Sequence, residues 1–238
     1  KYNFSIPPSR IFCALEKKKR EMRVNFLCRA ALVLSALSLG HAEDDKYVTC
    51  GSAVKLTHLG ASSSTKQYYL NSDTHNFSSG SGQQIVTVVP SKTKHSSLWN
   101  IREGHDQTPC TAGQKLTCGS RIRLTHISTG RNLHTHGIRS PLSRQQEVSG
   151  FGEDGEGDGG DDWIITCEGR DTYWMRNRPF KLQHKDTRTY LSSNAQYQYN
   201  QRNCGGNCPI MNHLEVAAKA TPDLETRWKV ELGVHLSH

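Results

Sequence analysis

The chain has 238 residues, of which 34% are hydrophobic and 22% charged, and this is the composition of a globular protein. Its formal net charge of +8 would ordinarily suggest nucleic acid as a partner. Residues 1–42 hold +6 of that charge and residues 43–238 keep only +2, so we expect no nucleic-acid partner.

A secretory leader is expected ahead of the folded domain. Residues 22–42 start at Met22 and combine positive charge, an apolar run and small residues, so we expect a signal peptide that is cleaved after Ala42. Residues 1–21 are interpreted as translated upstream sequence outside the native chain. No later segment approaches the roughly 18 uninterrupted apolar residues of a membrane span. The mature domain, residues 43–238, is therefore expected to be soluble, without membrane insertion.

Three copies of one short pattern follow along this domain. Each copy reads apolar, basic, Leu, polar, His, and the three are Val54–His58, Ile122–His126 and Phe180–His184. Each copy later closes on a tryptophan, with spacings of 64 and 65 residues between Trp99, Trp163 and Trp228. Such repetition is the signature of a fold built from repeated units.

Apolar and polar residues alternate within each pattern, which is the period of a half-buried strand. Stretches rich in Gly, Ser, Asn and Asp separate these segments and are typical of turns. One unit of four short strands cannot bury its apolar face alone, whereas three units can. We therefore predict an all-β, pseudo-threefold β-trefoil of about twelve short strands with the tryptophans packed inside. Its repeats are expected at about 48–105, 113–168 and 176–233.

With these landmarks in place, the sequence resembles the MIR-repeat proteins, in particular the stromal cell-derived factor 2 family of the endoplasmic reticulum. The resemblance is carried by CGSRIRLTHISTGRNLHTH from Cys118, SPLSRQQEVSGFGEDGEGDGGDDW from Ser140 and LQHKDTRTYLS from Leu182. It spans nearly the whole mature chain. It is weakest over NAQYQYNQRNCGGNCPIMNHLEV, which starts at Asn194.

The resemblance implies a non-enzymatic chaperone cofactor of the endoplasmic reticulum lumen, with a role in protein folding and quality control. The partners that it implies are a J-domain co-chaperone, the resident heat-shock chaperone and unfolded client proteins. The chain ends in HLSH, which is not a KDEL-type retrieval signal. We therefore expect either retention in the lumen by a partner or secretion.

Six cysteines remain after the leader, and an oxidising lumen would favour disulfides among them. The sequence leaves their pairing open. No CxxC pair is present, so a zinc site built on cysteines is disfavoured. Four of the six match family cysteines and two are additional: Cys50, Cys110, Cys118 and Cys167, then Cys204 and Cys208.

The repeated histidines are His58, His126 and His184, which occupy the same place in each copy. Because side chains two residues apart on a strand share a face, His58 should lie beside Val54 and Leu56. We expect buried, hydrogen-bonded histidines that support the fold. A polar ligand pocket beside each histidine is the alternative.

A second histidine pattern, HTH, could place the imidazoles of His134 and His136 on one face of a strand, with His126 nearby. A zinc site would need three ligands, and the sequence brings no third ligand to the right place. We therefore expect solvent-facing polar residues here and no metal.

Six acidic residues spaced by glycines lie before Trp163. Calcium binding is one interpretation, but the segment lacks the alternating acids and terminal Glu of an EF-hand loop. A flexible, solvated loop is the plainer interpretation. We favour a third, in which the carboxylates contact basic residues of a partner through Glu153, Asp154, Glu156, Asp158, Asp161 and Asp162.

The sequon NFS at Asn76 lies in a Ser-rich, turn-like stretch. It becomes a candidate glycosylation site if the leader directs the chain into the secretory pathway.

No catalytic arrangement emerges, since a GxSxG elbow, an HExxH pair and a P-loop are all absent from the sequence. We therefore expect a binding protein with no cofactor rather than an enzyme. The rival hypothesis is a secreted carbohydrate-binding trefoil, with weak glycan binding in shallow pockets between repeats. Lectins of that kind often repeat a Gln-any-Trp triplet, whereas SL, DD and TR precede the repeat tryptophans here, which counts against the rival.

Overall fold

The structure, a computed structural model, describes residues 46–91 and 94–234. The expected upstream sequence (1–21), the expected signal peptide (22–42) and the C-terminal HLSH lie outside these residues. In the described part of the chain, no helix has the length and apolar character needed to cross a lipid bilayer.

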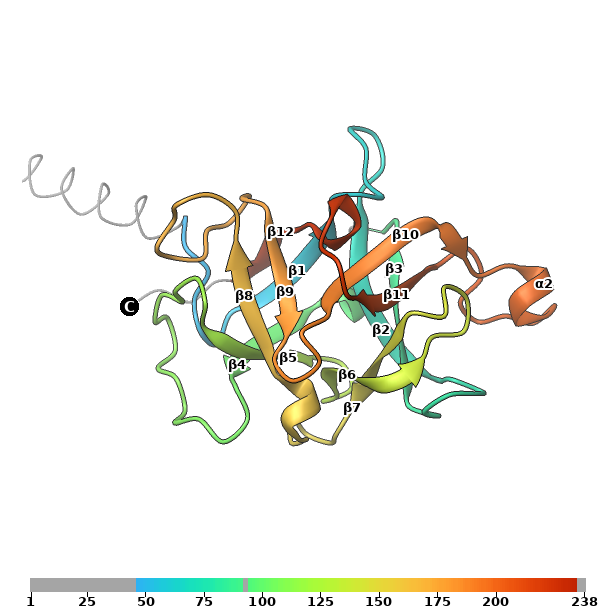
Figure 1. The fold of residues 1–238 in the computed structure, drawn as a ribbon, viewed down its shortest axis with the longest axis horizontal. Helices are drawn as coiled ribbons and strands as arrows, with labels where there is room; N and C mark the ends of the chain where they lie inside the picture. Colours follow the sequence, from blue (N-terminus) through green and yellow to red (C-terminus); the bar gives the residue numbers. More distant parts are fainter. Residues whose placement is uncertain (1–45, 92–93, 235–238) are drawn as a thin grey trace, which may run out of the picture. The chain divides into compact units, whose positions relative to one another are not determined.

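Twelve strands form the described unit, in three consecutive sets of four (Figure 1). The first set is β1 (Ala53–His58), β2 (Tyr68–Asn76), β3 (Gln84–Val89) and β4 (Trp99–Glu103). The second is β5 (Arg121–His126), β6 (Asn132–Arg139), β7 (Gln146–Phe151) and β8 (Trp163–Cys167). The third is β9 (Phe180–His184), β10 (Tyr190–Gln198), β11 (Leu214–Lys219) and β12 (Trp228–Val234). The predicted all-β fold is confirmed, and only β12 runs past its expected repeat, by one residue.

Short helices complete the described elements. A 3₁₀ turn precedes the closing tryptophan of each set, at η1 (His95–Ser97), η2 (Gly159–Asp161) and η3 (Leu224–Thr226). The α-helix α2 (Gln201–Cys204) belongs to the third set alone, and Figure 1 shows it at the tip of the β10–β11 hairpin.

The first and last strands of each set form a six-stranded barrel. Its strands pair in the closed cycle β1–β4–β5–β8–β9–β12–β1, and every pairing is antiparallel. The middle strands form the hairpins β2–β3, β6–β7 and β10–β11. These hairpins join one another through the pairings β3–β7, β7–β11 and β11–β3, and so close one end of the barrel. This is the pseudo-threefold trefoil that the repeats predict.

The other end of the barrel is closed by three extended segments. The Val48 N–H donates to the Trp174 carbonyl (2.9 Å), Trp174 to Leu116 (2.8 Å) and Leu116 to Val48 (3.2 Å). All three side chains belong to the main hydrophobic core. This triangle of hydrogen bonds satisfies backbone groups that would otherwise be buried without partners.

The repeat tryptophans fill the barrel. Trp99, Trp163 and Trp228 are completely buried, and a buried indole N–H needs an acceptor. Each finds one at the start of its own repeat's hairpin: Trp99 donates to the Leu70 carbonyl at 3.2 Å, Trp163 to Leu133 at 2.8 Å and Trp228 to Leu191 at 2.9 Å.

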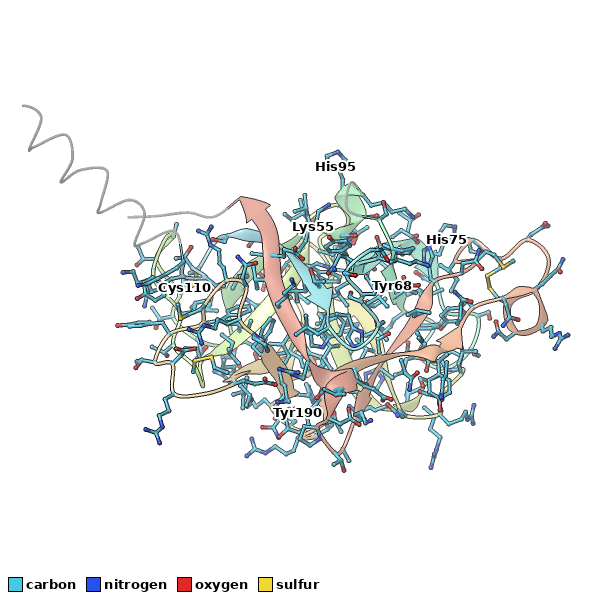
Figure 2. All side chains as sticks on the ribbon, turned by 90° about the horizontal axis from the view of Figure 1, so that it is seen from above. Lys55, Tyr68, His75, His95, Cys110 and Tyr190 are labelled. Carbon is cyan, nitrogen blue, oxygen red and sulfur yellow. A yellow bond between two sulfur atoms is a disulfide. The ribbon has the colours of Figure 1, made fainter. Side chains whose placement is uncertain are left out.

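All six cysteines of the described unit form disulfides, namely Cys50–Cys110, Cys118–Cys167 and Cys204–Cys208. The first two lie beside the barrel, and the third closes the loop that carries α2. Figure 2 shows Cys110 and His75, a residue of the β2–β3 hairpin, on opposite sides of the unit. The first two disulfides therefore cross-link the barrel end of the unit, and the third cross-links the hairpin end.

The disulfides should differ in their effect on stability because they close loops of very different length. Cys118–Cys167 spans 49 residues and Cys204–Cys208 spans 4. From loop-closure entropy, we expect the free energy of unfolding to fall by about 4 kcal/mol when Cys118 and Cys167 are both changed to Ala. The fall should be about 2 kcal/mol when Cys204 and Cys208 are both changed to Ala. Urea unfolding of both variants measures the difference, and equal losses would contradict this explanation.

Candidate functional site

The repeated histidines pack on the repeat tryptophans. Strand pairing sets His126 opposite Trp99, His184 opposite Trp163 and His58 opposite Trp228. The ring centroids are 5.0, 5.4 and 4.6 Å apart, respectively. Each histidine therefore covers the tryptophan of the preceding repeat, and the contacts close a cycle around the barrel.

Two hydrogen bonds define the tautomer of His58. The Ala61 backbone N–H donates to Nδ1 of His58 at 3.0 Å, so Nε2 carries the proton and donates to the Glu225 carbonyl at 2.7 Å. Burial lowers the pKa of His58 to about 4, and burial also lowers the pKa values of His126 and His184. The three rings are neutral and buried, and they stabilise the turn that follows the first strand of each repeat. Because they are buried, they are not accessible to a ligand.

The six acidic residues of the segment before Trp163 divide into two groups. Asp161 and Asp162 are buried, so the expected contact with basic residues of a partner is wrong for these two, and so is the alternative of a flexible, solvated loop. Asp162 accepts hydrogen bonds from the His105 backbone N–H at 2.6 Å and from the Arg121 guanidinium at 3.0 Å. Asp161 accepts from the Asn132 side chain at 3.0 Å. Neither carboxylate is available to a macromolecular partner.

The other four acids, Glu153, Asp154, Glu156 and Asp158, are exposed. Glu153 and Glu156 exchange two backbone hydrogen bonds, of 3.0 and 2.8 Å, which close a tight turn. The Gly155 carbonyl within this turn accepts from Arg102, Arg123 and Asn132 at 3.2, 3.1 and 3.0 Å. The turn therefore presents its carboxylates from a backbone that is tied to the barrel.

The HTH pattern on β6 lies against this acidic segment. His134 is almost fully buried, so the expectation that it faces solvent is wrong. Its Nδ1 lies 2.9 Å from Oδ1 of Asp161, and its Nε2 lies 2.7 Å from Nδ1 of His136. The two motifs that the sequence shows separately thus meet in one cluster.

One threefold-related position of the hairpins holds Ile85, Glu147 and Glu215, and all three are buried. Glu147 accepts hydrogen bonds from the side chain and backbone of Ser81, in the hairpin of the first repeat. Glu215 accepts from the Leu142 and Ser143 backbone N–H groups at 2.7 and 2.9 Å, in the hairpin of the second. Each glutamate thus holds the turn of the preceding repeat.

Ile85 holds the third hairpin by apolar contact. It packs in a second hydrophobic cluster with Phe77, Tyr199, Cys208 and Ile210, which covers one side of the Cys204–Cys208 loop. Burial, with smaller contributions from Glu215 and Glu147, raises the pKa of the Tyr199 phenol. Burial also raises the pKa of Glu147, and the neighbouring Glu215 carboxylate adds to that effect.

Several of these residues are not among those that the sequence patterns single out. Glu147 and Glu215 lie in the repeated segments QQEV and HLEV, one residue before a buried valine, and this position could have indicated them. Trp174 is buried in the barrel end, but the equivalent residues Val48 and Leu116 conceal its place in the repeat.

The candidate glycosylation residue, Asn76, is exposed at the end of β2, where it pairs with Gln84 of β3. Phe77 of the sequon is buried, whereas Ser78 is exposed. An open groove of about 480 Å³ lies elsewhere, between the second and third hairpins, and includes Arg139, Gln146, Thr189, Lys219 and Thr221 in its lining.

The closed barrel, the hairpin end and the threefold-repeated Trp–His contacts define a β-trefoil protein. The sequence pattern of the MIR domain matches residues 33–206. Mouse stromal cell-derived factor 2 is 42% identical over 210 residues, which cover 86% of this chain and 92% of that protein. The chain therefore belongs to the MIR-domain family and, within it, to the stromal cell-derived factor 2 family.

Solved structures agree with this assignment. The crystal structure of the related protein from Arabidopsis thaliana superposes with a TM-score of 0.72 at 32% identity and covers 80% of this chain and 98% of that one. A yeast protein O-mannosyltransferase chain, in the Pmt1–Pmt2 complex bound to the sugar donor, matches with a TM-score of 0.65 at 28% identity. That match covers 80% of this chain but only 26% of the transferase chain.

The burial of His58 makes stability depend on pH. Its folded-state pKa of about 4 lies below the ordinary histidine value of 6.5, so the unfolded chain binds more protons between these values and stability falls as pH decreases from about 6.5 to 4. At about 1.4 kcal/mol per pKa unit, we expect a contribution on the order of 3 kcal/mol. When urea unfolding is measured at several pH values across this range, the free energy of unfolding should depend less on pH in His58→Gln than in the wild type. The control is His95→Gln, at an exposed histidine.

The buried Glu215 should be far more sensitive to amide substitution than an exposed glutamate. In Glu215→Gln, the new NH₂ group must face a backbone N–H of Leu142 or Ser143, so a donor opposes a donor. We expect a loss of about 1–3 kcal/mol in the free energy of unfolding. The exposed control Glu153→Gln should change it by less than about 0.5 kcal/mol. Similar small losses in both variants would contradict this role of Glu215.

Proposed function

We propose that this protein is a non-enzymatic chaperone cofactor that acts with a J-domain co-chaperone and the lumenal heat-shock chaperone on unfolded client proteins. The observation that carries the proposal is the similarity to stromal cell-derived factor 2 over almost the whole length of that relative. The buried side chains that repeat in all three units are used for packing. Because these side chains are used for packing, we infer that the protein acts through contacts of its surface with other proteins.

The compartment that we propose is the endoplasmic reticulum lumen or the exterior of the cell. Three disulfides in a unit of this size favour an oxidising compartment. The exposed Asn76 and Ser78 of the sequon are compatible with glycosylation in the same pathway.

The surface that we propose for the co-chaperone is the acidic turn formed by Glu153, Asp154 and Glu156. Its backbone is tied to the barrel through the Gly155 carbonyl, so little conformational entropy is lost when a partner binds. Carboxylates on such a surface complement basic residues and accelerate association. The expected partner surface of six acids is thereby reduced to three, because Asp161 and Asp162 are structural and Asp158 caps η2.

Neutralising the turn tests both the partner and the surface. In the triple variant Glu153→Gln, Asp154→Asn and Glu156→Gln, we expect affinity for a recombinant J-domain co-chaperone to fall about tenfold at low salt, because rim charges contribute about 0.5 kcal/mol each. Surface plasmon resonance measures the change. The control variant Asp106→Asn, Asp186→Asn and Asp223→Asn carries the same charge change elsewhere.

Three outcomes separate the proposals. Loss of affinity in the turn variant alone supports both partner and surface. Equal affinity in the two variants rejects the acidic turn but leaves the co-chaperone role in place. A wild-type chain that neither binds the co-chaperone nor reduces client aggregation in its presence rejects the chaperone role.

Carbohydrate binding is the second candidate function. The groove whose lining includes Gln146 and Thr189 has room for a sugar residue, and the related yeast chain belongs to a complex bound to a sugar donor. A glycan array with the secreted chain distinguishes the two functions. Strong, selective glycan binding without co-chaperone binding would favour this candidate over the chaperone role.

A further inference from the structure

We propose that His134, Asp158 and Asp161 form a binding site for one divalent transition-metal ion of the zinc class. One ligand atom from each residue contributes to a group whose members all lie within 4.8 Å of one another. The Nδ1 atom of His134 is 2.9 Å from Oδ1 of Asp161 and 3.6 Å from Oδ1 of Asp158. Ligands around a tetrahedral zinc ion, at about 2.0–2.2 Å from the metal, are separated by about 3.3–3.6 Å.

The two carboxylates are held in place without blocking the site. In the capping box of η2, Oδ1 of Asp158 accepts from the Gly160 N–H at 2.8 Å and keeps its second lone pair for an ion, and Oδ2 of Asp161 accepts from the Asp158 N–H at 3.0 Å. Asn132 also donates to Oδ2 of Asp161. These contacts orient Oδ1 of Asp161 toward the imidazole, and such preorganisation is what a metal site requires.

A second histidine occupies the position of an outer-sphere partner. The Nε2 atom of His134 lies 2.7 Å from Nδ1 of His136, on the side of the ring away from the carboxylates. When Nδ1 of His134 binds metal, Nε2–H can donate to His136, which is the usual arrangement of a ligating histidine. A neutral His134 ring keeps one proton, so on metal binding this proton leaves Nδ1 and Nε2 becomes protonated by exchange with solvent. His136 then accepts at Nδ1 and carries its own proton on Nε2.

Gly160 allows the groups to approach this closely. A Cβ atom at residue 160 would lie 2.3 Å from Cε1 and 2.8 Å from Nδ1 of His134, and 3.0 Å from Oδ1 of Asp158. Side-chain atoms would therefore compete with an ion for this space. The Asp158 side chain is 58% exposed, which leaves one side open for water as a further ligand.

The other two repeats provide internal comparisons for the structural role of these positions. The equivalents of His134, Asp158 and Asp161 are Asn71, Lys94 and Ser97 in the first repeat and Ser192, Asp223 and Thr226 in the third. All three repeats form the same 3₁₀ turn, so the fold does not require this combination. Only the second repeat brings one imidazole and two carboxylates together, and these are the ligand types that zinc accepts.

Zinc titration of the full chain tests the site. The variant Asp158→Asn removes one carboxylate, and asparagine is an equally good N-cap, so η2 should persist. The matched control is Asp223→Asn, the equivalent cap of η3. By calorimetry with zinc chloride, we expect one site per chain that is weakened on the order of 10- to 100-fold by Asp158→Asn and unchanged by Asp223→Asn.

Thermal unfolding supplies a second measurement. Zinc that binds the folded site raises Tm by mass action in the wild type and in Asp223→Asn, and should raise it much less in Asp158→Asn. Cysteine or histidine ligands elsewhere in the chain are common to both variants and cancel in the comparison. Equal zinc affinity and equal Tm shifts in the two variants would overturn the site, as would the absence of wild-type binding. The result does not bear on the chaperone proposal.

Discussion

The hydrogen bond from each repeat tryptophan to the leucine carbonyl of its own hairpin is the contact on which the trefoil depends. The indole fills the barrel, and its single polar group requires an acceptor in a place without water. The bond therefore fixes how the hairpin sits on the barrel. The histidine of the following repeat then covers the ring, so three local contacts become one closed cycle.

The tryptophan and histidine that recur in all three repeats form the packing contacts of this cycle. Side chains with another role therefore lie at positions where the three repeats differ. Ile85 stands where Glu147 and Glu215 stand in the other hairpins. The glutamates can hold turns that offer hydrogen-bond donors, as Leu142 and Ser143 do for Glu215. An isoleucine cannot, so the hairpin that it faces is held by an apolar cluster and a short disulfide.

The sequence was sufficient for the architecture because the repeat tryptophans and histidines recur with nearly constant spacing and strands alternate with a period of two. It was insufficient for the acidic segment, where we expected all six carboxylates to be available to a partner. The burial of Asp161 and Asp162 depends on donors supplied by Asn132, His105 and Arg121, which are distant in sequence. Long-range pairing, unlike periodicity, leaves no local pattern in the chain.

The acidic segment therefore combines two physical roles that its composition hides. Its first half forms a tied turn whose charges cost little free energy because they stay hydrated. Its second half buries carboxylates, which is tolerable only because each oxygen lies close to a donor or a cation. A glycine within each half permits this arrangement, since Gly155 of the turn directs its carbonyl to three donors and Gly160 of η2 leaves room for the His134 ring. Surface charge and buried charge can thus lie within ten residues without compromising the core.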